Sequence, residues 1–349
     1  MEEIAAKLQE KYGLRVFGGQ EVGSRYEMDT DSGTYYLFSC PAAYRSKAKF
    51  VGSVEQHLAK APRIHLLPSA TTYQNEGYFL HDDKLYYVKQ GVRSGSLANE
   101  AYVIGESLAR FHQATASFTG EKSFRTFSSL GNWPELWRQK LKQFDEHRDH
   151  LDDQEEVTPF DEYLLTTYTY VSQLGDAAVQ YLEGTGYTKK AKAPGKYGKV
   201  AFQNFDESFV FFAESGEQLV AGEWSWILDI RSRDIAQWIK SDIRRNGWDE
   251  QKVLAFLTGY TDVEPLAEEE FAWVYALLMY PGRFLKQVEM VRQSAEEEEE
   301  ELEDMGDWEA KLDGELLAME PVLQHFPRLV SNRYGATIPA LEWSLWNNS

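Results

Sequence analysis

The chain has 349 residues, of which 43% are hydrophobic and 14% aromatic. It is therefore a globular protein, long enough for two lobes with their own cores. Its formal net charge of −20 repels nucleic-acid phosphates, so we expect no nucleic-acid partner. Because Cys40 is the single cysteine, the sequence excludes an internal disulfide and a cysteine-based zinc site.

The N-terminal part of the chain predicts one helix followed by strands. Residues 1–13 form an amphipathic pattern without the basic and apolar regions of a signal peptide. Antiparallel strands are predicted at 14–19 and 25–40, with Asp31-Ser32-Gly33 as a turn. A helix follows at 46–61, and then two strands joined by Asp82-Asp83. No apolar run reaches the roughly 18 residues of a membrane-spanning helix, so we expect no membrane span.

The remainder of the chain predicts mostly helices, interrupted by a β-rich stretch at 199–224. The helical patterns cover residues 98–115, 132–151, 160–182, 232–244, 249–260, 267–295 and 308–326. Residues 296–304, "EEEEEELED", are almost entirely acidic. This run predicts a solvated, self-repelling surface segment, and an acidic docking segment is the alternative.

The order of these elements resembles a known architecture. A β-rich lobe with one helix, a linker near Gly91–Gly95 and a larger helical lobe resemble the protein-kinase-like fold. "GESLARFHQAT" (105–115) and "RSRDIAQWI" (231–239) resemble helices of its aminoglycoside-phosphotransferase branch. Four segments resemble the spore-coat kinase-like family of the CotS/YutH type more closely: "TDSGTYYLFSC", "KFVGSVEQHLAKA", "DDKLYYVKQGV" and "YTDVEPLAEEEFAWVYALLMYPGRFLK".

The resemblance implies an α+β, two-lobed, aminoglycoside phosphotransferase-like fold. The β-rich N-lobe is expected at 1–91 and the helical C-lobe at 96–349. Within the C-lobe we expect a degenerate catalytic hairpin at 199–224 and an acidic insert at 295–305.

A kinase-like site needs a lysine on the third strand, which pairs with phosphates and with a glutamate on the following helix. The lysine position falls on Phe38, with Ser39 next, and neither carries a positive charge. Lys47 and Lys49 lie at or near the start of the next helix. Glu55 matches the helix glutamate. Because its partner position is lost, Glu55 is predicted as an ordinary solvated helix residue, with a surviving nucleotide contact as the alternative.

The catalytic loop of the resemblance, His-x-Asp-x-x-x-x-Asn, aligns with "AFQNFDESFV". Its histidine falls on Phe202, its aspartate base on Asn204 and its metal-binding asparagine on Phe209. Asn204 has no negative charge, and a phenyl ring cannot ligate a hard cation. Asp206 is a weak alternative base in the same loop.

The metal-binding aspartate of the resemblance falls on Glu223 in "AGEWSW". A glutamate can ligate Mg²⁺, so Glu223 is a weak metal candidate, and a polar residue at a strand end is the alternative. Asp234 matches a family aspartate that bonds to backbone near the catalytic loop. Gly18, Gly19 and Gly23 are too loosely spaced for a phosphate loop, and a turn explains them.

The resemblance supplies a spore-coat role and the altered positions predict that catalysis is lost. We therefore expect a pseudokinase with a structural or regulatory role in endospore coat assembly, without a cofactor, whose partners are other coat proteins. The resemblance implies synthesis in the mother-cell cytoplasm and then a place in the spore coat. Two alternatives stay open. One is an active aminoglycoside- or homoserine-type phosphotransferase that uses ATP and Mg²⁺ with Asp206 and Glu223, and the other is a nucleotide-binding switch without turnover.

Overall fold

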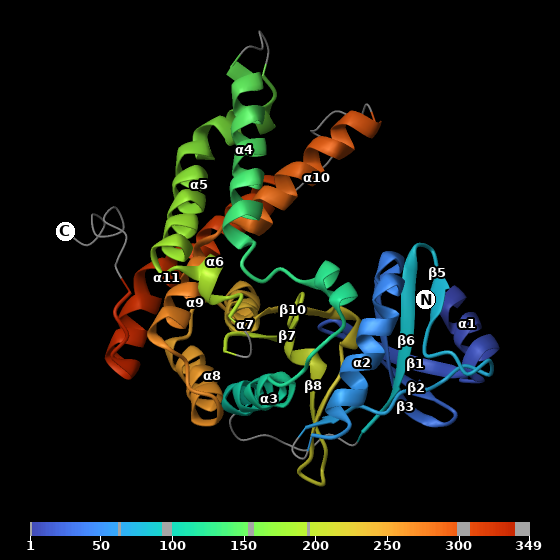
Figure 1. Cartoon of the computed structure of the whole chain (residues 1–349). Coiled ribbons are helices and arrows are strands. Elements are labelled where there is room, and N and C mark those ends of the chain that lie inside the picture. Colours follow the sequence, from blue (N-terminus) through green and yellow to red (C-terminus); the bar gives the residue numbers. More distant parts are fainter. Residues whose placement is uncertain are drawn as a thin grey trace. The chain divides into compact units, whose positions relative to one another are not determined.

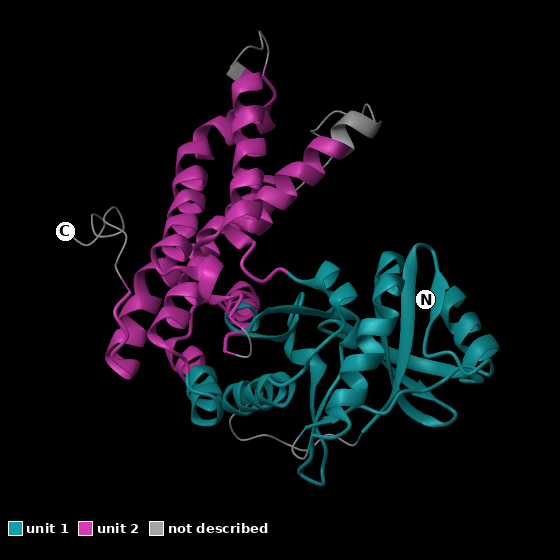
Figure 2. Ribbon diagram, in the orientation of Figure 1, with its two compact units in different colours: residues 1–128, 198–234, 255–265 teal, residues 129–197, 235–254, 266–349 magenta. Residues whose placement is uncertain are grey.

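A computed structural model describes residues 2–61, 64–92, 100–152, 157–193, 196–298 and 308–338 (Figure 1). The chain forms two compact units, each built from three segments (Figure 2). Unit 1 contains residues 1–128, 198–234 and 255–265, and unit 2 contains 129–197, 235–254 and 266–349. The division into lobes at 91 and 96 involves residues outside the described part and stays a prediction. The acidic run lies almost wholly outside it too.

Unit 1 contains a five-stranded antiparallel sheet in the order β1-β2-β3-β6-β5. Its strands are β1 (Val16–Val22), β2 (Arg25–Thr30), β3 (Gly33–Pro41), β5 (Phe79–His81) and β6 (Lys84–Gln90). Thr30 pairs with Gly33, which confirms the predicted hairpin turn. Asp82 and Asp83 have φ values of 44° and 54°, the left-handed backbone of a two-residue hairpin loop.

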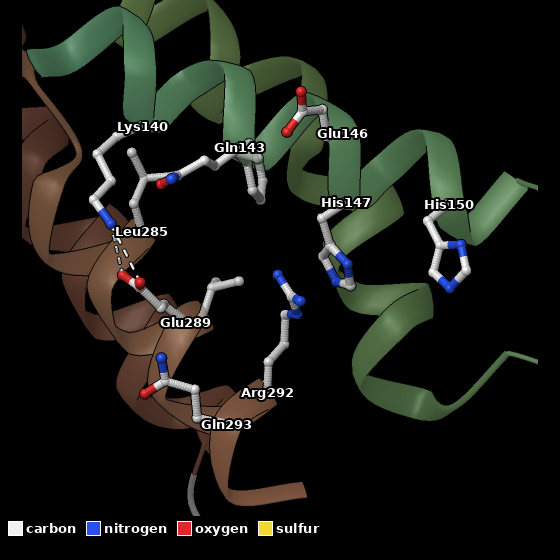
Figure 3. A pocket seen from close by; sticks show the side chains of 11 residues that line it. Lys140, Gln143, Glu146, His147, His150, Leu285, Glu289, Arg292 and Gln293 are labelled. Atoms are coloured by element: carbon white, nitrogen blue, oxygen red, sulfur yellow. Dashed lines mark hydrogen bonds and ion pairs between the residues drawn. The ribbon is translucent and has the colours of Figure 1, made fainter. Parts of the chain in front are cut away.

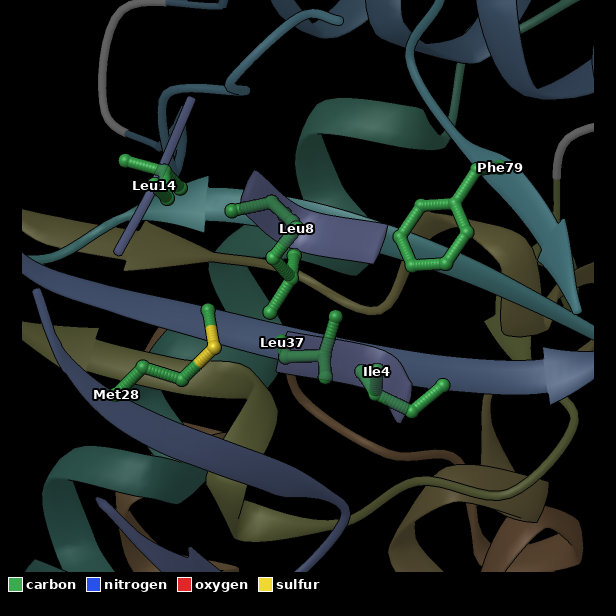
Figure 4. Packing of buried hydrophobic residues seen from close by; sticks show 7 residues of the cluster. Ile4, Leu8, Leu14, Met28, Leu37 and Phe79 are labelled. Atoms are coloured by element: carbon green, nitrogen blue, oxygen red, sulfur yellow. The ribbon is translucent and has the colours of Figure 1, made fainter. Parts of the chain in front are cut away.

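Helix α1 (Glu2–Tyr12) covers one face of this sheet (Figure 4). Its apolar residues Ile4 and Leu8, one turn apart, pack against side chains of the sheet, as the amphipathic pattern predicts. The buried cluster consists of Ile4, Leu8, Leu14, Met28, Leu37, Phe79 and Val88. Leu37 and Val88 anchor β3 and β6 in this core, and these strands carry Phe38 and Lys89 of the candidate site.

The β-rich stretch at 199–224 contains strands that belong to two different sheets. Strand β7 (Gly198–Phe202) pairs with β10 (Trp226–Ile230), which lies beyond that stretch. Strand β8 (Val210–Phe212) instead pairs with β9 (Gln218–Val220), and β9 runs parallel to β4 (His65–Leu66). A local sequence pattern identifies strands but does not choose their partners.

The other helices of unit 1 are α2 (Ala48–Leu58), α3 (Glu100–Thr115) and the C-terminal part of α8 (Glu250–Val263). Short 3₁₀ turns lie at Ala42–Lys47 (η1), Lys122–Phe127 (η2), Glu207–Phe209 (η3) and Glu223–Ser225 (η4). The backbones of α3 and α8 approach each other closely at Gly105. A Cβ on Gly105 would lie 2.1 Å from the carbonyl oxygen of Phe256, so only glycine fits where α3 meets α8.

Unit 2 is helical in the part that the structure describes. It contains α4 (Trp133–Asp152), α5 (Pro159–Gly184), α6 (Tyr187–Lys190), most of α7 (Ser232–Asn246), α9 (Glu268–Met279), α10 (Gly282–Glu298) and α11 (Trp308–Tyr334). The single helix predicted at 267–295 is in fact two helices, because Pro281 lacks the N–H that a continuous helix needs. One unit contains a sheet and the other is helical in its described residues, which confirms the predicted α+β class.

Candidate functional site

The loop between β7 and β8 carries the predicted catalytic positions, and two of them are core. Phe202 and Phe209 are only 1% and 6% exposed. Their rings stack with centroids 5.6 Å apart. Asn204, at the predicted position of the base, is instead exposed to solvent. The loop therefore brings two aromatic rings together and leaves its amide outside them.

Phe38 completes this aromatic packing from the sheet side. Its ring stacks on Tyr87 of β6 at 5.1 Å and lies 6.1 Å from the ring of Phe209. Phe202 in turn contacts Phe111 of α3 at 4.8 Å. The three positions where the resemblance has a lysine, a histidine and an asparagine thus carry rings that form one continuous apolar cluster.

A second aromatic contact joins β3 to β8. Tyr36 and Phe211 lie with ring centroids 4.8 Å apart. The guanidinium of Arg25 lies over both rings, 5.2 Å from Tyr36 and 4.6 Å from Phe211. Such cation–π contacts stabilise a desolvated guanidinium. These contacts close the space between the sheet and the β8 strand.

Asp206, the alternative base, forms part of a turn. Its Oδ1 accepts the backbone N–H of Ser208 at 2.8 Å, the N-cap hydrogen bond of η3. The β1–β2 turn lies against the same residues: Ser24 N donates to Ser208 Oγ at 3.0 Å, and Arg25 Nη1 donates to Ser208 O at 2.6 Å. Gly23 has φ +58°, and a Cβ there would lie 2.5 Å from Asp206 Oδ1. The turn is therefore packed directly on the loop.

Glu223 lies at the start of η4 and is 3% exposed. Its carboxylate Oε1 forms an ion pair with Nζ of Lys89 on β6, which is 1% exposed and also donates to Ser69 Oγ at 2.8 Å. Glu223 Oε2 is buried without a hydrogen-bond partner among the described residues. Gly222 before it has φ +82°, and a Cβ there would lie 2.8 Å from the Phe209 ring.

Glu55 of α2 belongs to the same electrostatic cluster. Burial raises the pKa of its carboxyl, the charge of Glu223 raises it further, and Lys89 partly offsets the change. Its side chain is neither fully exposed nor fully buried. Two carboxylates therefore share the field of one ammonium, and Lys89 pairs directly with Glu223.

Lys47, the last residue of η1, is a second buried ammonium of unit 1. Its Nζ donates to Gln203 Oε1 at 3.1 Å and lies 3.4 Å from the carbonyl oxygens of both Trp224 and Trp226. Burial lowers the pKa of Lys47 to about 8. Three oxygens match the three donors of an ammonium. Lys47 thus ties the segment before α2 to the β7–β8 loop and to η4.

Asp234 of α7 binds the backbone at the C-terminal end of β7. Both its carboxylate oxygens lie 3.0 Å from the backbone N of Phe202, and Oδ2 is 2.9 Å from Nε2 of His112. The other His112 nitrogen, Nδ1, bonds to Tyr260 Oη at 2.8 Å. Burial lowers the pKa of His112 far below its usual value, so the ring is neutral. Burial also raises the pKa of Asp234, but the Phe202 N–H and Arg233 oppose this change and favour the carboxylate. The Nε2–H of His112 then donates to Asp234, and Tyr260 donates to Nδ1.

Arg233 fixes the loop from the other side. Its Nη1 pairs with Asp229 Oδ2 at 2.9 Å, and its Nη2 donates to the carbonyl of Gln203 at 2.7 Å. Asp229 also accepts the N–H of Ile230 through Oδ1 at 2.8 Å. The side chain and the carbonyl of Gln203 are therefore both bound, by Lys47 and Arg233 respectively.

Sequence reasoning missed Lys89. Its signal is the alternation of "KLYYVKQ": Leu85, Tyr87 and Lys89 share one face of β6, and a lysine on a buried face requires an acidic partner. Nothing local predicts that the partner is Glu223, because the two residues meet only through the tertiary fold.

Within the described residues, one group of side chains could hold a metal ion by ligand spacing: Glu3, His81 and Asp82. None of the predicted catalytic-loop or metal positions belongs to it. None of the helices described here has the length and apolar character required to cross a membrane.

A family model described as spore coat putative kinase YutH matches residues 5–311. The chain belongs to this YutH family. The endospore coat-associated protein YutH of Bacillus subtilis is 24% identical over 308 residues, which cover 87% of this chain and 88% of that protein. Spore coat protein S of the same organism is 23% identical and covers 74% of each chain. The predicted family resemblance is confirmed.

Solved structures confirm the fold of this YutH-family chain. An aminoglycoside phosphotransferase from Alicyclobacillus acidocaldarius matches with a TM-score of 0.59 and 14% identity, covering 90% of this chain and 93% of that one. Spectinomycin phosphotransferase matches with a TM-score of 0.56 and 11% identity, covering 93% and 97%. At these identities the likeness concerns the fold, which is the predicted aminoglycoside phosphotransferase-like one.

Proposed function

We propose that this YutH-family chain is a catalytically degenerate kinase-like protein that acts as a structural or regulatory component in endospore coat assembly. The observation that carries the proposal is the packing of Phe38, Phe202 and Phe209 into one buried cluster. Phosphoryl transfer depends on positioned charges and on a base. Apolar rings at these positions supply neither.

The remaining polar groups of the loop support the proposal. Asn204 is an exposed amide and has no useful basicity at neutral pH. One carboxylate oxygen of Asp206 accepts a hydrogen bond from the Ser208 N–H, and the β1–β2 turn packs against the same oxygen. Neither residue has the freedom and basicity of a general base that accepts a hydroxyl proton.

The charged groups do not fit a nucleotide-bound metal ion. Glu223 already pairs with Lys89, and the neighbouring position for an oxygen ligand is the ring of Phe209. Lys47 already binds the nearby carbonyl oxygens of Trp224 and Trp226. Two ammonium groups of the protein thus provide positive charge in this part of the fold. We therefore propose that the protein works without ATP and Mg²⁺.

The names of the relatives supply the place of action. One is called endospore coat-associated and the other a spore coat protein. We propose that this chain likewise reaches the spore coat after synthesis in the mother cell and that its partners are other coat proteins.

One observation favours the alternative of an active phosphotransferase. Lys89, Glu223 and Glu55 place a buried lysine between two acidic groups, and Glu223 Oε2 has no hydrogen-bond partner among the described residues. A relocated lysine could pair with a phosphate in place of the missing one at Phe38. This alternative still requires Asp206 to leave its turn and serve as the base.

A thermal-shift titration with ATP, with and without Mg²⁺, tests these proposals. Ligand that binds the folded state raises the melting temperature, so no shift at millimolar ATP is the expected result. A Mg²⁺-dependent shift would overturn the cofactor-free proposal.

Phosphoryl transfer to a small-molecule hydroxyl, measured on the same sample, separates a binding switch from an enzyme. An Asp206→Asn variant is the control for any turnover that appears. Turnover abolished by this change would support the active alternative, and turnover that persists would remove Asp206 as its base.

A further inference from the structure

A cluster of cations in unit 2 surrounds a small cavity where α7, α9, α10 and α11 meet. Lys240 and Arg244 come from α7, Arg283 from the first turn of α10, and Glu315 from α11. The cavity has a volume of about 30 Å³. That space holds one small group and is far too small for a nucleotide.

The charges in this cluster do not balance. Arg283 Nε donates to Glu315 Oε1 at 2.9 Å. Arg244 Nη1 lies 3.7 Å from the same oxygen, too far for a hydrogen bond, and it is buried without a hydrogen-bond partner among the described residues. Lys240 Nζ donates to the carbonyl of Tyr280 at 2.9 Å, which is neutral. One carboxylate therefore faces three cations, of which Arg283 is largely exposed to solvent and Lys240 and Arg244 are partly buried.

The surroundings make this imbalance costly. Burial lowers the pKa of Lys240 to about 7, and the positive charges of Arg244 and Arg283 lower it further against the opposing effect of Glu315. Burial also lowers the pKa of Arg244. Unpaired buried charges destabilise a fold unless a counter-ion joins them.

The start of α10 adds positive potential at the same place. The helix runs from Gly282 to Glu298, and its first turn contains no acidic side chain. Arg283 and Phe284 of that turn line the cavity. The free N–H groups at a helix start attract anions, and the effect is strongest within the first turn.

We propose that this cavity binds one small doubly charged oxyanion, an inorganic phosphate or sulfate. When Lys240 is protonated, three cations and one carboxylate leave two positive charges, which a dianion neutralises. The apolar walls, Ile243, Leu278, Phe284, Met319 and Val322, and the small volume leave no room for an organic group beside the anion. The site lies wholly in unit 2, shares no residue with the candidate site above and does not depend on the proposed function.

A larger cavity of about 450 Å³ between α4 and α10 provides the contrast (Figure 3). There Lys140 pairs with Glu289 at 3.0 Å, and Glu146 and Arg292 add one charge of each sign. Because these four charges cancel, that cavity has no comparable need for an anion. The cation cluster of α7, α10 and α11 therefore differs from this larger cavity by its excess of positive charge.

Calorimetric titration of the full chain tests the proposal, with sulfate, inorganic phosphate, phenyl phosphate and acetate at constant ionic strength. We expect the dianions to bind and to raise the melting temperature, and acetate to bind at least about tenfold more weakly. Phenyl phosphate, whose ring exceeds the cavity, is expected to bind more weakly than inorganic phosphate, and tighter binding of the ester would contradict the assignment. If no dianion binds more tightly than acetate, the proposal is wrong.

The Lys240→Met variant distinguishes a Lys240 that binds an anion from one with only a structural role. The variant is expected to bind sulfate at least about tenfold more weakly and, in the absence of the dianion, to melt at a higher temperature than the wild type. Lys142→Met removes an exposed charge from α4 and serves as the matched control. A Lys240→Met protein that melts lower and binds sulfate as the wild type does would overturn the proposal. Arg244→Met provides the same binding test if Lys240→Met does not fold.

The pH dependence of sulfate binding gives an independent check, because sulfate stays a dianion from pH 6 to 9. Lys240 loses its charge across this range, and the other charged groups that line the cavity are Arg244, Arg283 and Glu315. Binding is therefore expected to weaken as the pH rises in the wild type and to stay constant in Lys240→Met. Binding to the wild type that does not change with pH would contradict the role of Lys240.

Discussion

Lys89 and Glu223 form a buried ion pair that joins the β-sheet of unit 1 to the η4 turn. Lys89 is on β6, and the predicted lysine position, Phe38, is on the neighbouring strand β3. The fold thus keeps a lysine–acid contact in this region while the lysine comes from a different strand. Both side chains are buried, so removal of either partner leaves the other charge buried and unpaired.

Lys89→Met is expected to lower the free energy of unfolding by about 3–5 kcal/mol, because it leaves the carboxylate of Glu223 buried and unpaired. Adding Glu223→Met to this variant should restore most of the loss. Urea unfolding of both single variants and the double variant measures the coupling.

The exposed pair Lys142–Glu146 on α4 is the control, with an expected coupling of at most about 0.5 kcal/mol. If Lys89→Met alone is as stable as the wild type, the ion pair is not formed in solution.

Phe209→Asn restores the residue type of the metal-binding position and is expected to cost about 3–5 kcal/mol. The change removes a ring that packs on Phe202, Phe38 and Gly222, and it buries an amide in their place. Mg²⁺ should not restore the lost stability. Phe17→Asn at a 65% exposed position is the control. A melting temperature of Phe209→Asn that rises with Mg²⁺ would reveal a residual metal site.

Asp234→Asn is expected to destabilise unit 1 by about 1–3 kcal/mol. The amide oxygen can still accept the Phe202 N–H, but the amide nitrogen then has no acceptor at Nε2–H of His112. Asp262→Asn, which alters an exposed contact to Tyr102, is the control. Equal denaturation midpoints for Asp234→Asn and the wild type would show that the carboxylate does not accept from both donors.

Glu55→Gln tests the charge balance around Lys89 through its pH dependence. The pKa of Glu55 is raised in the folded protein, so the unfolded chain loses this proton at a lower pH. Stability therefore falls as the pH rises from the unfolded value near 4.5 through the folded value, and the penalty is complete above it. Glu55→Gln should accordingly be more stable than the wild type at pH 7, with the difference vanishing below about pH 4.5.

The matched control is Glu21→Gln on the exposed face of β1, which should show no such difference. A Glu55→Gln variant that is less stable than the wild type at pH 7 would mean that Glu55, and not Glu223 alone, is the working partner of Lys89.

Most of the strands and helices could be predicted from the sequence because their apolar residues recur with clear periods. The alternation of apolar and polar residues predicted β3 and β6. Asp82-Asp83 predicted the turn between β5 and β6. Strand partners could not be predicted: β7 pairs with β10 across an intervening hairpin. One helix was predicted where the structure has two, although Pro281 marks the break.

The sequence predicted those features of the candidate site that depend on the identity of a single residue. The replacements at Phe38, Phe202 and Phe209 could be identified by position, and their apolar character indicated burial. Lys89–Glu223 and the oxygens around Lys47 depend on contacts between segments far apart in the sequence. Such contacts follow from the tertiary fold, and one sequence does not specify them.

The assembly of unit 1 from residues 1–128, 198–234 and 255–265 has a consequence for biosynthesis. The hydrogen bond from Ser24 to Ser208 joins residues 184 positions apart, and Tyr260 must be present before His112 gains its second partner. A ribosome adds about 5–20 residues per second, so these partners emerge many seconds after the sheet has been made. During that interval the sheet exposes Tyr36 and one side of Phe38, because Phe211 and Phe209 have not yet been made, so apolar surface stays uncovered on the nascent chain until β8 emerges.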